Sequence, residues 1–195
     1  MSSQPSTILT PEEYLEIERR AEWKSEYFQG EMVEAPHVNR RHVLIVTNLI
    51  CGLSQRLKQR PCGVYASNLR LRVAATDFYT YPDVMAICGH PQMHGDQDDI
   101  ALNPVLIVEV LSESTEAYDR GKKFEQYRTL PSLCEYLLVA QDAPRIEQWI
   151  RQPDDNWLRA ETSGTDVSIQ LASVDCVLPL SEIYHKIEWP AVGTD

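Results

Sequence analysis

The spacing of apolar and polar positions predicts two helices in the first third of the chain. Thr10-Pro11-Glu12-Glu13 combines an N-cap residue, a proline in the first turn and two acids, which predicts a helix running to about Ala21. A longer amphipathic helix is predicted over 39–58. There the apolar residues follow the three-and-four spacing of a buried stripe: Val43, Val46, Leu49, Ile50, Leu53 and Leu57.

Strand patterns bracket and follow these helices. Residues 26–33 predict a hairpin that turns at Gln29-Gly30, and 69–73 alternates so that Arg70 and Arg72 share one face. Further strands are predicted over 84–87, 105–111, 136–140, 146–151 and 157–160, with a polar loop over 89–103, a helix capped by 112–116 that runs to about Thr129, and a short helix over 180–186. This order predicts one mixed α/β domain over 1–195, with a core of about 10–187 and flexible termini.

Two carboxylates interrupt the apolar strands. Asp83 follows Tyr81-Pro82 at the start of one strand, and Glu109 lies inside the near-continuous apolar run 104–111. Acids are poor strand residues, and a buried unpaired charge is costly. If the two strands are neighbours in one sheet, both acids reach one point, where they suit a hard cation such as Mg²⁺.

Composition narrows the class of protein. The chain has 195 residues, 43% hydrophobic, which is enough for one domain with a core. It contains no apolar run long enough to span a bilayer, and its first residues lack a basic and an apolar signal segment. The cytoplasm is therefore the expected compartment, with no membrane partner.

The five cysteines form no C-x-x-C pair and are odd in number. This argues against both a disulfide framework and a zinc ribbon. Most lie beside apolar residues, so we expect reduced thiols in the core.

The net charge of −11 disfavours nonspecific binding of nucleic acid by the molecule as a whole. Its distribution is uneven, because 35–76 contains no Asp or Glu. A locally positive face is one interpretation, and ordinary solvated charges are the other. The basic residues of this stretch are Arg40, Arg41, Arg56, Lys58, Arg60, Arg70 and Arg72.

A candidate catalytic cation follows the second acid. Lys123 borders the apolar stripe of the helix after Glu109, so its ammonium can point back toward the strand ends. Asp119 lies four residues before Lys123, and a plain helix salt bridge is the competing explanation.

Several motifs together resemble the Uma-type endonuclease family. They are Pro82-Asp83, Glu109-Val110-Leu111-Ser112-x-Ser114-Thr115, Asp119-Arg120-x-x-Lys123-x-x-x-Tyr127, Glu135-Tyr136-Leu137-Leu138-Val139, Glu26-Tyr27-x-x-Gly30-Glu31 and His42. The resemblance covers roughly Thr10 to Tyr184. It implies the restriction-endonuclease-like fold, a central mixed β-sheet flanked by helices, with the active site at one sheet edge.

The resemblance also implies metal-dependent cleavage of DNA, with Mg²⁺ or a substituting Mn²⁺ held by Asp83, Glu109 and the Val110 carbonyl. Glu31 is a further candidate acid near the metal. The usual Glu-x-Lys signature is broken by Leu111, and Lys123 on the next helix is the displaced lysine. A homodimer is expected by analogy with the superfamily. Candidate substrate contacts are Arg40, His42, Arg70, Arg72 and Arg120.

Three hypotheses follow. The chain is a metal-dependent endonuclease, a nuclease-like DNA-binding or partner-binding module with weak catalysis, or a structural domain whose two acids are merely hydrogen-bonded. The endonuclease is the first hypothesis, while the missing in-strand lysine and the acidic net charge favour the second.

Overall fold

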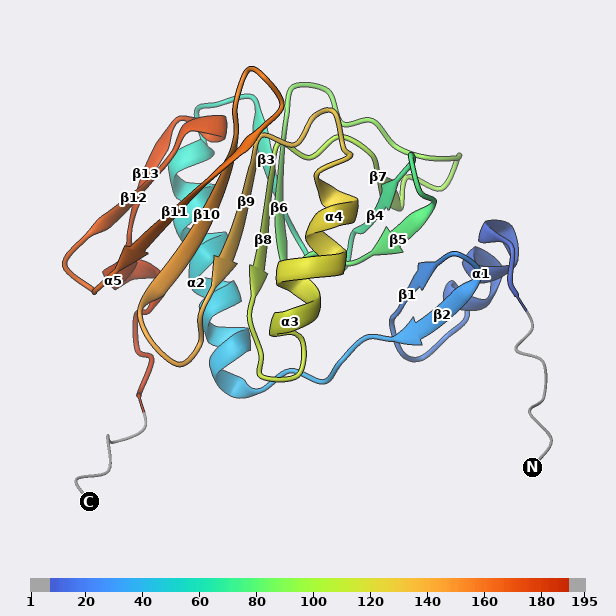
Figure 1. The fold of residues 1–195 in the computed structure, drawn as a ribbon, viewed down its shortest axis with the longest axis horizontal. Coiled ribbons are helices and arrows are strands. Elements are labelled where there is room, and N and C mark those ends of the chain that lie inside the picture. Colours follow the sequence, from blue (N-terminus) through green and yellow to red (C-terminus); the bar gives the residue numbers. More distant parts are fainter. Residues whose placement is uncertain (1–7, 190–195) are drawn as a thin grey trace.

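A six-stranded mixed sheet forms the centre of the computed structural model, which describes residues 8–189 (Figure 1). Its strand order is β11-β10-β9-β8-β6-β3, with β8 and β9 parallel and the other neighbours antiparallel. The strands are β3 (Cys62–Ala66), β6 (Val84–Cys88), β8 (Leu106–Val110), β9 (Glu135–Val139), β10 (Arg145–Arg151) and β11 (Trp157–Ser163). The fold is thus the mixed α/β sheet with flanking helices that the sequence predicts.

A second sheet and a small third one complete the described strands. The five-stranded sheet has the order β2-β1-β5-β4-β7, and β12 pairs with β13 beside the main sheet. Their bounds are β1 (Ser25–Phe28), β2 (Glu31–Glu34), β4 (Arg70–Val73), β5 (Phe78–Thr80), β7 (Ile100–Ala101), β12 (Ser168–Leu171) and β13 (Cys176–Pro179). The β1–β2 hairpin is as predicted, and Gln29 and Gly30 both have positive φ, as a two-residue hairpin turn requires.

Helices cover the two faces of the main sheet (Figure 1). One face packs against α2 and α5 and the other against α4, each over its own buried cluster. The helical segments are α1 (Pro11–Glu18), α2 (Arg40–Leu57), α3 (Glu116–Tyr118), η1 (Asp119–Lys123), α4 (Phe124–Tyr127), η2 (Ala172–Val174) and α5 (Leu180–Ile183).

The long helix α2 is confirmed within a residue at each end, between Asn39 as N-cap and Lys58 as C-cap. The Asn39 side chain accepts a hydrogen bond from the backbone N–H of His42 at 2.9 Å. Leu49, Leu53 and Leu57 of the predicted stripe are buried, and Val46 and Ile50 pack partly against the same cluster. Only the first position differs, because Ile45 is fully buried while Val43 is 51% exposed.

The helix after Glu109 is not regular. α3, η1 and α4 run on without a break from 116 to 127, but η1 is a π-helical turn, in which each backbone hydrogen bond spans one residue more than in an α-helix. Such turns are frequent at functional sites. This one carries Asp119 and Lys123, both of which are buried.

The cysteines depart from expectation. Cys62 and Cys88 form a disulfide, because the β3–β6 register places them directly opposite each other. Cys51 and Cys134 are exposed thiols, and only Cys176 is a buried one. The prediction that most of the cysteines are reduced core thiols is wrong, because Cys176 alone of the five is a buried thiol. Strand register, which pairs Cys62 with Cys88, cannot be deduced from cysteine spacing.

Candidate active site

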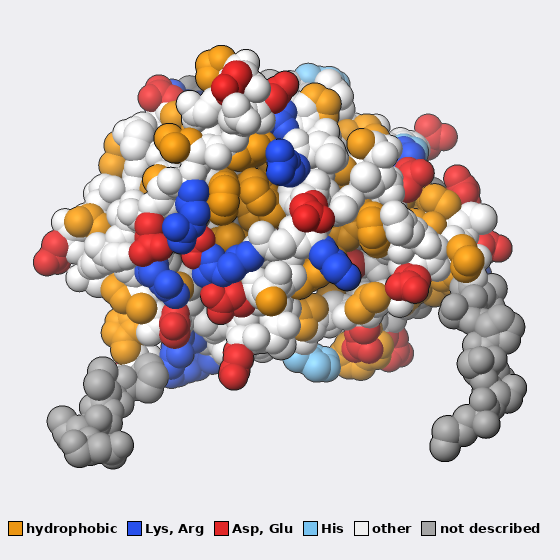
Figure 2. Space-filling view, viewed as in Figure 1, with side chains coloured by type: hydrophobic (Ala, Val, Ile, Leu, Met, Phe, Trp, Pro, Cys, Tyr) orange, Lys and Arg blue, Asp and Glu red, His pale blue; other side chains and the backbone are white. Residues whose placement is uncertain are grey.

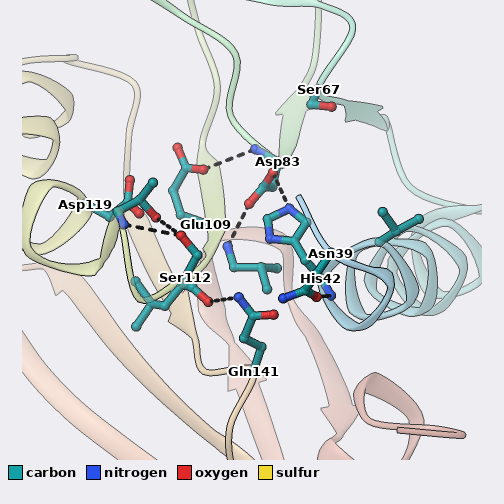
Figure 3. A network of polar contacts seen from close by, with 12 residues as sticks. Asn39, His42, Ser67, Asp83, Glu109, Ser112, Asp119 and Gln141 are labelled. Carbon is teal, nitrogen blue, oxygen red and sulfur yellow. Dashed lines mark hydrogen bonds and ion pairs between the residues drawn. The ribbon is translucent and has the colours of Figure 1, made fainter. Parts of the chain in front are cut away.

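Asp83 and Glu109 stand opposite each other on neighbouring antiparallel strands. The register pairs Val84 with Val108, and its continuation by one residue pairs the two acids. The backbone N–H of Asp83 donates to Glu109 Oε2 at 3.3 Å. The structure therefore brings together the two carboxylates that the sequence singles out, at one end of the central sheet (Figure 3).

Both oxygens of the Asp83 carboxylate are held. The backbone N–H of Val110 donates to Oδ2 at 2.8 Å, and Nε2 of His42 lies 3.0 Å from Oδ1. Nδ1 of His42 is buried without a hydrogen-bond partner in the described structure. Because a carboxylate oxygen accepts, Nε2 of His42 is the nitrogen that donates to Asp83. His42 lies against Asp83 and also lines the cleft, so its predicted contact with substrate stays a prediction.

Glu109 is a buried acid with a raised pKa. Its residue is 3% exposed, and its Oε1 accepts from the Tyr127 hydroxyl at 2.7 Å and lies 3.0 Å from Nζ of Lys123. Burial raises the pKa of Glu109 to about 8, and the nearby Asp83 and Asp119 charges add to the rise while Lys123 opposes it. A bound cation would favour the ionised form of this carboxyl group.

Lys123 reaches back to the strand acids. Its Nζ lies 3.0 Å from Glu109 Oε1, 3.1 Å from Glu26 Oε1 and 3.5 Å from Asp119 Oδ1. Burial alone would lower the pKa of Lys123, but the surrounding acids, led by Glu109, raise it well above the usual value. The predicted helix salt bridge with Asp119 is present, and it is the longest of the three contacts.

Glu26 is a site residue that the sequence reasoning missed. It comes from β1, and its carboxylate accepts from the Thr80 hydroxyl at 2.5 Å and the Tyr118 hydroxyl at 3.0 Å. Burial opposes its ionisation, but Lys123 and these hydroxyls hold the pKa of Glu26 below its usual value. Glu31, the acid predicted for this place, is exposed on β2 and does not line the cleft beside Asp83. Glu26 belongs to the Glu-Tyr-x-x-Gly-Glu motif, which was the one available signal.

A cleft of about 180 Å³ opens onto these groups. Asp83, Glu109 and Lys123 line it, together with the 35–38 segment and Lys24. Nζ of Lys24 donates to the Ser67 carbonyl at 2.8 Å and to Asn68 Oδ1 at 2.7 Å, so a second cation lies at its wall. Burial lowers the pKa of Lys24, while the charge of Asp83 raises it. The cleft thus combines four carboxylates, two amines and two histidines: Glu26, Asp83, Glu109, Asp119, Lys24, Lys123, His37 and His42.

The predicted basic residues do not gather at this cleft. Arg70 is 5% exposed and donates to the Tyr81 hydroxyl, while Arg72 pairs with Asp77. Arg40 lies at the start of α2 as an exposed partner of Glu188, and Arg120 is held by Glu116 and Glu147. Their roles in substrate binding stay predictions, without support from their positions.

Acids from elsewhere in the chain also pair with basic residues of the acid-free stretch 35–76. Arg56 pairs with Glu182 and Arg60 with Asp175. On the face shown in Figure 2, basic and acidic side chains are interspersed. These contacts favour the interpretation of ordinary surface charges over that of a continuous positive face.

The oxygen-rich donor set at Asp83 and Glu109 fits a hard cation. In a paired strand the N–H and C=O of one residue face the same neighbour, so the Val110 carbonyl is directed to the same side as Asp83. Within residues 8–189, no group of three or more His, Cys, Asp or Glu side chains is arranged to hold a metal. A metal here would therefore need the backbone carbonyl and water as further ligands.

The geometry defines a nuclease-like class of protein, and the comparisons agree. The sequence profile described as "Uma2: Putative restriction endonuclease" matches residues 11–181. The chain belongs to the Uma2 family. Among the described residues, none forms a helix long and apolar enough to cross a membrane.

Two similar proteins come from Synechocystis sp. (strain ATCC 27184 / PCC 6803 / Kazusa). "Uncharacterized protein sll1609" is 37% identical over 165 residues, which is 85% of this chain and 93% of that protein. "Uncharacterized protein slr1290" is 35% identical over 185 residues, 95% of this chain and 96% of that protein.

A solved structure shares the fold. It is described as a putative nuclease belonging to DUF820 from Anabaena variabilis, and it superimposes with a TM-score of 0.73 at 17% identity. The match covers 90% of this chain and 97% of that one. The restriction-endonuclease-like architecture predicted from sequence is thus confirmed at the level of fold.

Proposed function

We propose that this protein is a metal-dependent endonuclease that hydrolyses phosphodiester bonds in DNA. The observation that carries the proposal is the contact between Lys123 Nζ and Glu109 Oε1 at 3.0 Å, with Asp83 opposite Glu109. It supplies a lysine beside the two acids although the strand itself lacks one. Membership of the Uma2 family supports the same activity.

Asp83, Glu109 and the Val110 carbonyl are the residues that would hold Mg²⁺ or Mn²⁺. When bound, such an ion activates water and screens the charge of a phosphodiester. The chain's own residues prepare the site for it. His42 and the Val110 N–H fix the Asp83 carboxylate, and the Tyr127 hydroxyl fixes one oxygen of Glu109.

Lys123 is the proposed catalytic cation. Its ammonium is buried and remains charged, because Glu26 and Glu109 accept from it. A fixed positive charge beside the cleft stabilises the negative charge that develops on the phosphate, or orients the attacking water. Glu26 and Asp119 hold the ammonium in place.

Nicking of supercoiled plasmid DNA tests the proposal. With Mg²⁺ or Mn²⁺ the wild type should nick the plasmid, and Asp83→Asn and Glu109→Gln should not. Wild-type protein that binds neither ion and never nicks DNA would overturn it.

A binding module with weak catalysis is the second candidate. It is favoured by the three carboxylates around Lys123, which satisfy the ammonium without any substrate. Salt-dependent DNA binding with no cleavage in either metal would support it over the enzyme. A homodimer and a cytoplasmic location also stay predictions.

A further inference from the structure

A second cavity adjoins the cleft on the hairpin side. It has a volume of about 380 Å³, within the range of roughly 300–1,000 Å³ usual for small-molecule sites. Residues of β1, β2 and β5 form one wall, and residues of 114–122 form the other. The side chains that matter to its chemistry are Phe28, Phe78, Tyr118, Glu31, Glu34 and Lys122.

The walls of this cavity are aromatic. Phe28 is half-buried and packs edge to face on the buried ring of Phe78, with centroids 5.9 Å apart and planes at 85°. Tyr118 stands on the α3 side, and Val33 is 62% exposed on the hairpin. Flat aromatic surfaces of this kind accept another planar ring, and every nucleobase has one.

The polar groups of the cavity are mostly acids. Glu31 and Glu34 are exposed on β2, Glu26 lies at the shared wall, and Lys122 is the one basic lining residue among those described. Carboxylates repel phosphate but accept hydrogen bonds from exocyclic amino groups, as in the contact of Glu or Asp with cytosine N4. The chemistry therefore selects a base rather than the sugar-phosphate backbone.

The cleft and the second cavity share part of their lining. Glu26, Pro36 and Thr115 contribute to both. Tyr118 links them, because its hydroxyl donates to Glu26 and Lys123 Nζ lies 5.9 Å from its ring centroid. A ring stacked in the second cavity would thus leave its attached phosphate on the side of the acid cluster.

We propose that this cavity binds one unstacked nucleobase with an exocyclic amino group, cytosine, adenine or guanine, next to the phosphate that is cut. The inference rests on the proposed function, and it narrows the substrate to strands in which a nucleotide is unpaired or extruded. An unpaired base enters such a pocket at lower cost, because it has already lost its pairing and stacking.

Binding measurements without cleavage test this. In EDTA, fluorescence anisotropy compares short labelled duplexes with a single bulged C, A or T and a fully paired duplex. Bulged C and A should bind about tenfold tighter than bulged T and the paired duplex, a gain within the range of stacking on an aromatic side chain. Equal binding of all four DNAs would overturn the inference.

Two variants and a control locate the effect. Phe28→Leu should weaken binding of bulged C and A, and Glu34→Ala should abolish their advantage over bulged T while leaving paired DNA bound no more weakly. Glu125→Ala, an exposed acid on α4 outside the cavity, should keep the preference. A preference that survives in both cavity variants would place the base elsewhere and overturn the inference.

These outcomes are separable from the proposed function. A wild type that nicks plasmid but shows no preference among bulges overturns the base pocket alone. A wild type that prefers bulged C and A but cuts no DNA supports the base pocket and overturns the nuclease.

Discussion

Nζ of Lys123 lies 3.0 Å from Oε1 of Glu109, although the two residues belong to different elements. The strand β8 ends in Val110, and the lysine comes from the π-helical turn η1 that packs over it. The basic partner of Glu109 thus comes from an adjacent helical turn and not from the strand that carries the acid.

Lys123→Met removes this charge while keeping an unbranched apolar stem. We expect plasmid nicking to fall by about 10²–10³-fold, as when one group that stabilises developing charge is lost. The variant also leaves Glu26 and Glu109 without their ammonium, so a lower unfolding midpoint is expected alongside. Lys58→Met, at the exposed C-cap of α2, is the matched control and should retain activity.

Asp83→Asn should abolish binding of Mg²⁺ and Mn²⁺ in isothermal titration, because an amide is a weaker ligand for hard cations than a carboxylate. Asp96→Asn, in the exposed 89–99 loop, should bind as the wild type does. Undiminished metal binding by Asp83→Asn would show that the metal binds elsewhere than at Asp83 and Glu109.

His42 is expected to act by positioning Asp83. Removal of a residue that orients a metal ligand typically costs 10–100-fold in metal affinity or activity. We expect about a tenfold loss of Mn²⁺ affinity in His42→Ala and partial recovery in His42→Gln, whose amide N–H can still donate to Oδ1. Equal losses in both variants would indicate a packing role for the imidazole.

Glu147 predicts a pH dependence of stability remote from the cleft. It is 4% exposed and is bound by Arg120 and Arg159, which hold its pKa below the usual value against the opposing effect of burial. Its contribution is therefore complete above pH 4.5 and is lost as the pH falls through the lowered pKa. In urea unfolding near neutral pH, Glu147→Gln should be less stable by about 1.5–3 kcal/mol, the usual worth of a hydrogen bond to a charged group. The difference from wild type should shrink toward about pH 3.

The Cys62–Cys88 disulfide should stabilise the edge of the main sheet. It closes a loop with a sequence separation of 26 residues. A reducing agent or Cys88→Ser should therefore lower the free energy of unfolding by about 2–4 kcal/mol. Mass spectrometry after alkylation without reductant should find label on Cys51 and Cys134 but not on Cys62, and label on Cys62 would contradict the pairing.

Sequence patterns predicted what depends on local order. The ends of α2 follow from its caps, and the strands around Asp83 and Glu109 follow from their apolar runs. That these two strands lie next to each other in one sheet could only be assumed from the sequence. The register of β6 and β8 confirms it.

What escaped prediction depends on contacts distant in sequence. Glu26 reaches Lys123 only because the β1–β2 hairpin packs beside η1. The spacing of apolar residues in the strands does not indicate this packing. The pairing of Cys62 with Cys88 depends on register, and Arg40 and Arg120, predicted as DNA contacts, meet the distant acids Glu188 and Glu147. Local charge counts cannot reveal such partners.

The π-helical turn makes the acid cluster sensitive to chain length as well as to residue type. Deleting Gly121, a position with open space around it, would remove one residue from η1 and allow a regular α-helix. Each residue of an α-helix turns it by about 100°, so Asp119 and Tyr118 would rotate away from Lys123 and Tyr127. The far-ultraviolet circular dichroism spectrum would change little, although the side-chain contacts of the acid cluster would be lost. Related proteins should therefore differ in this turn by substitutions more often than by insertions or deletions.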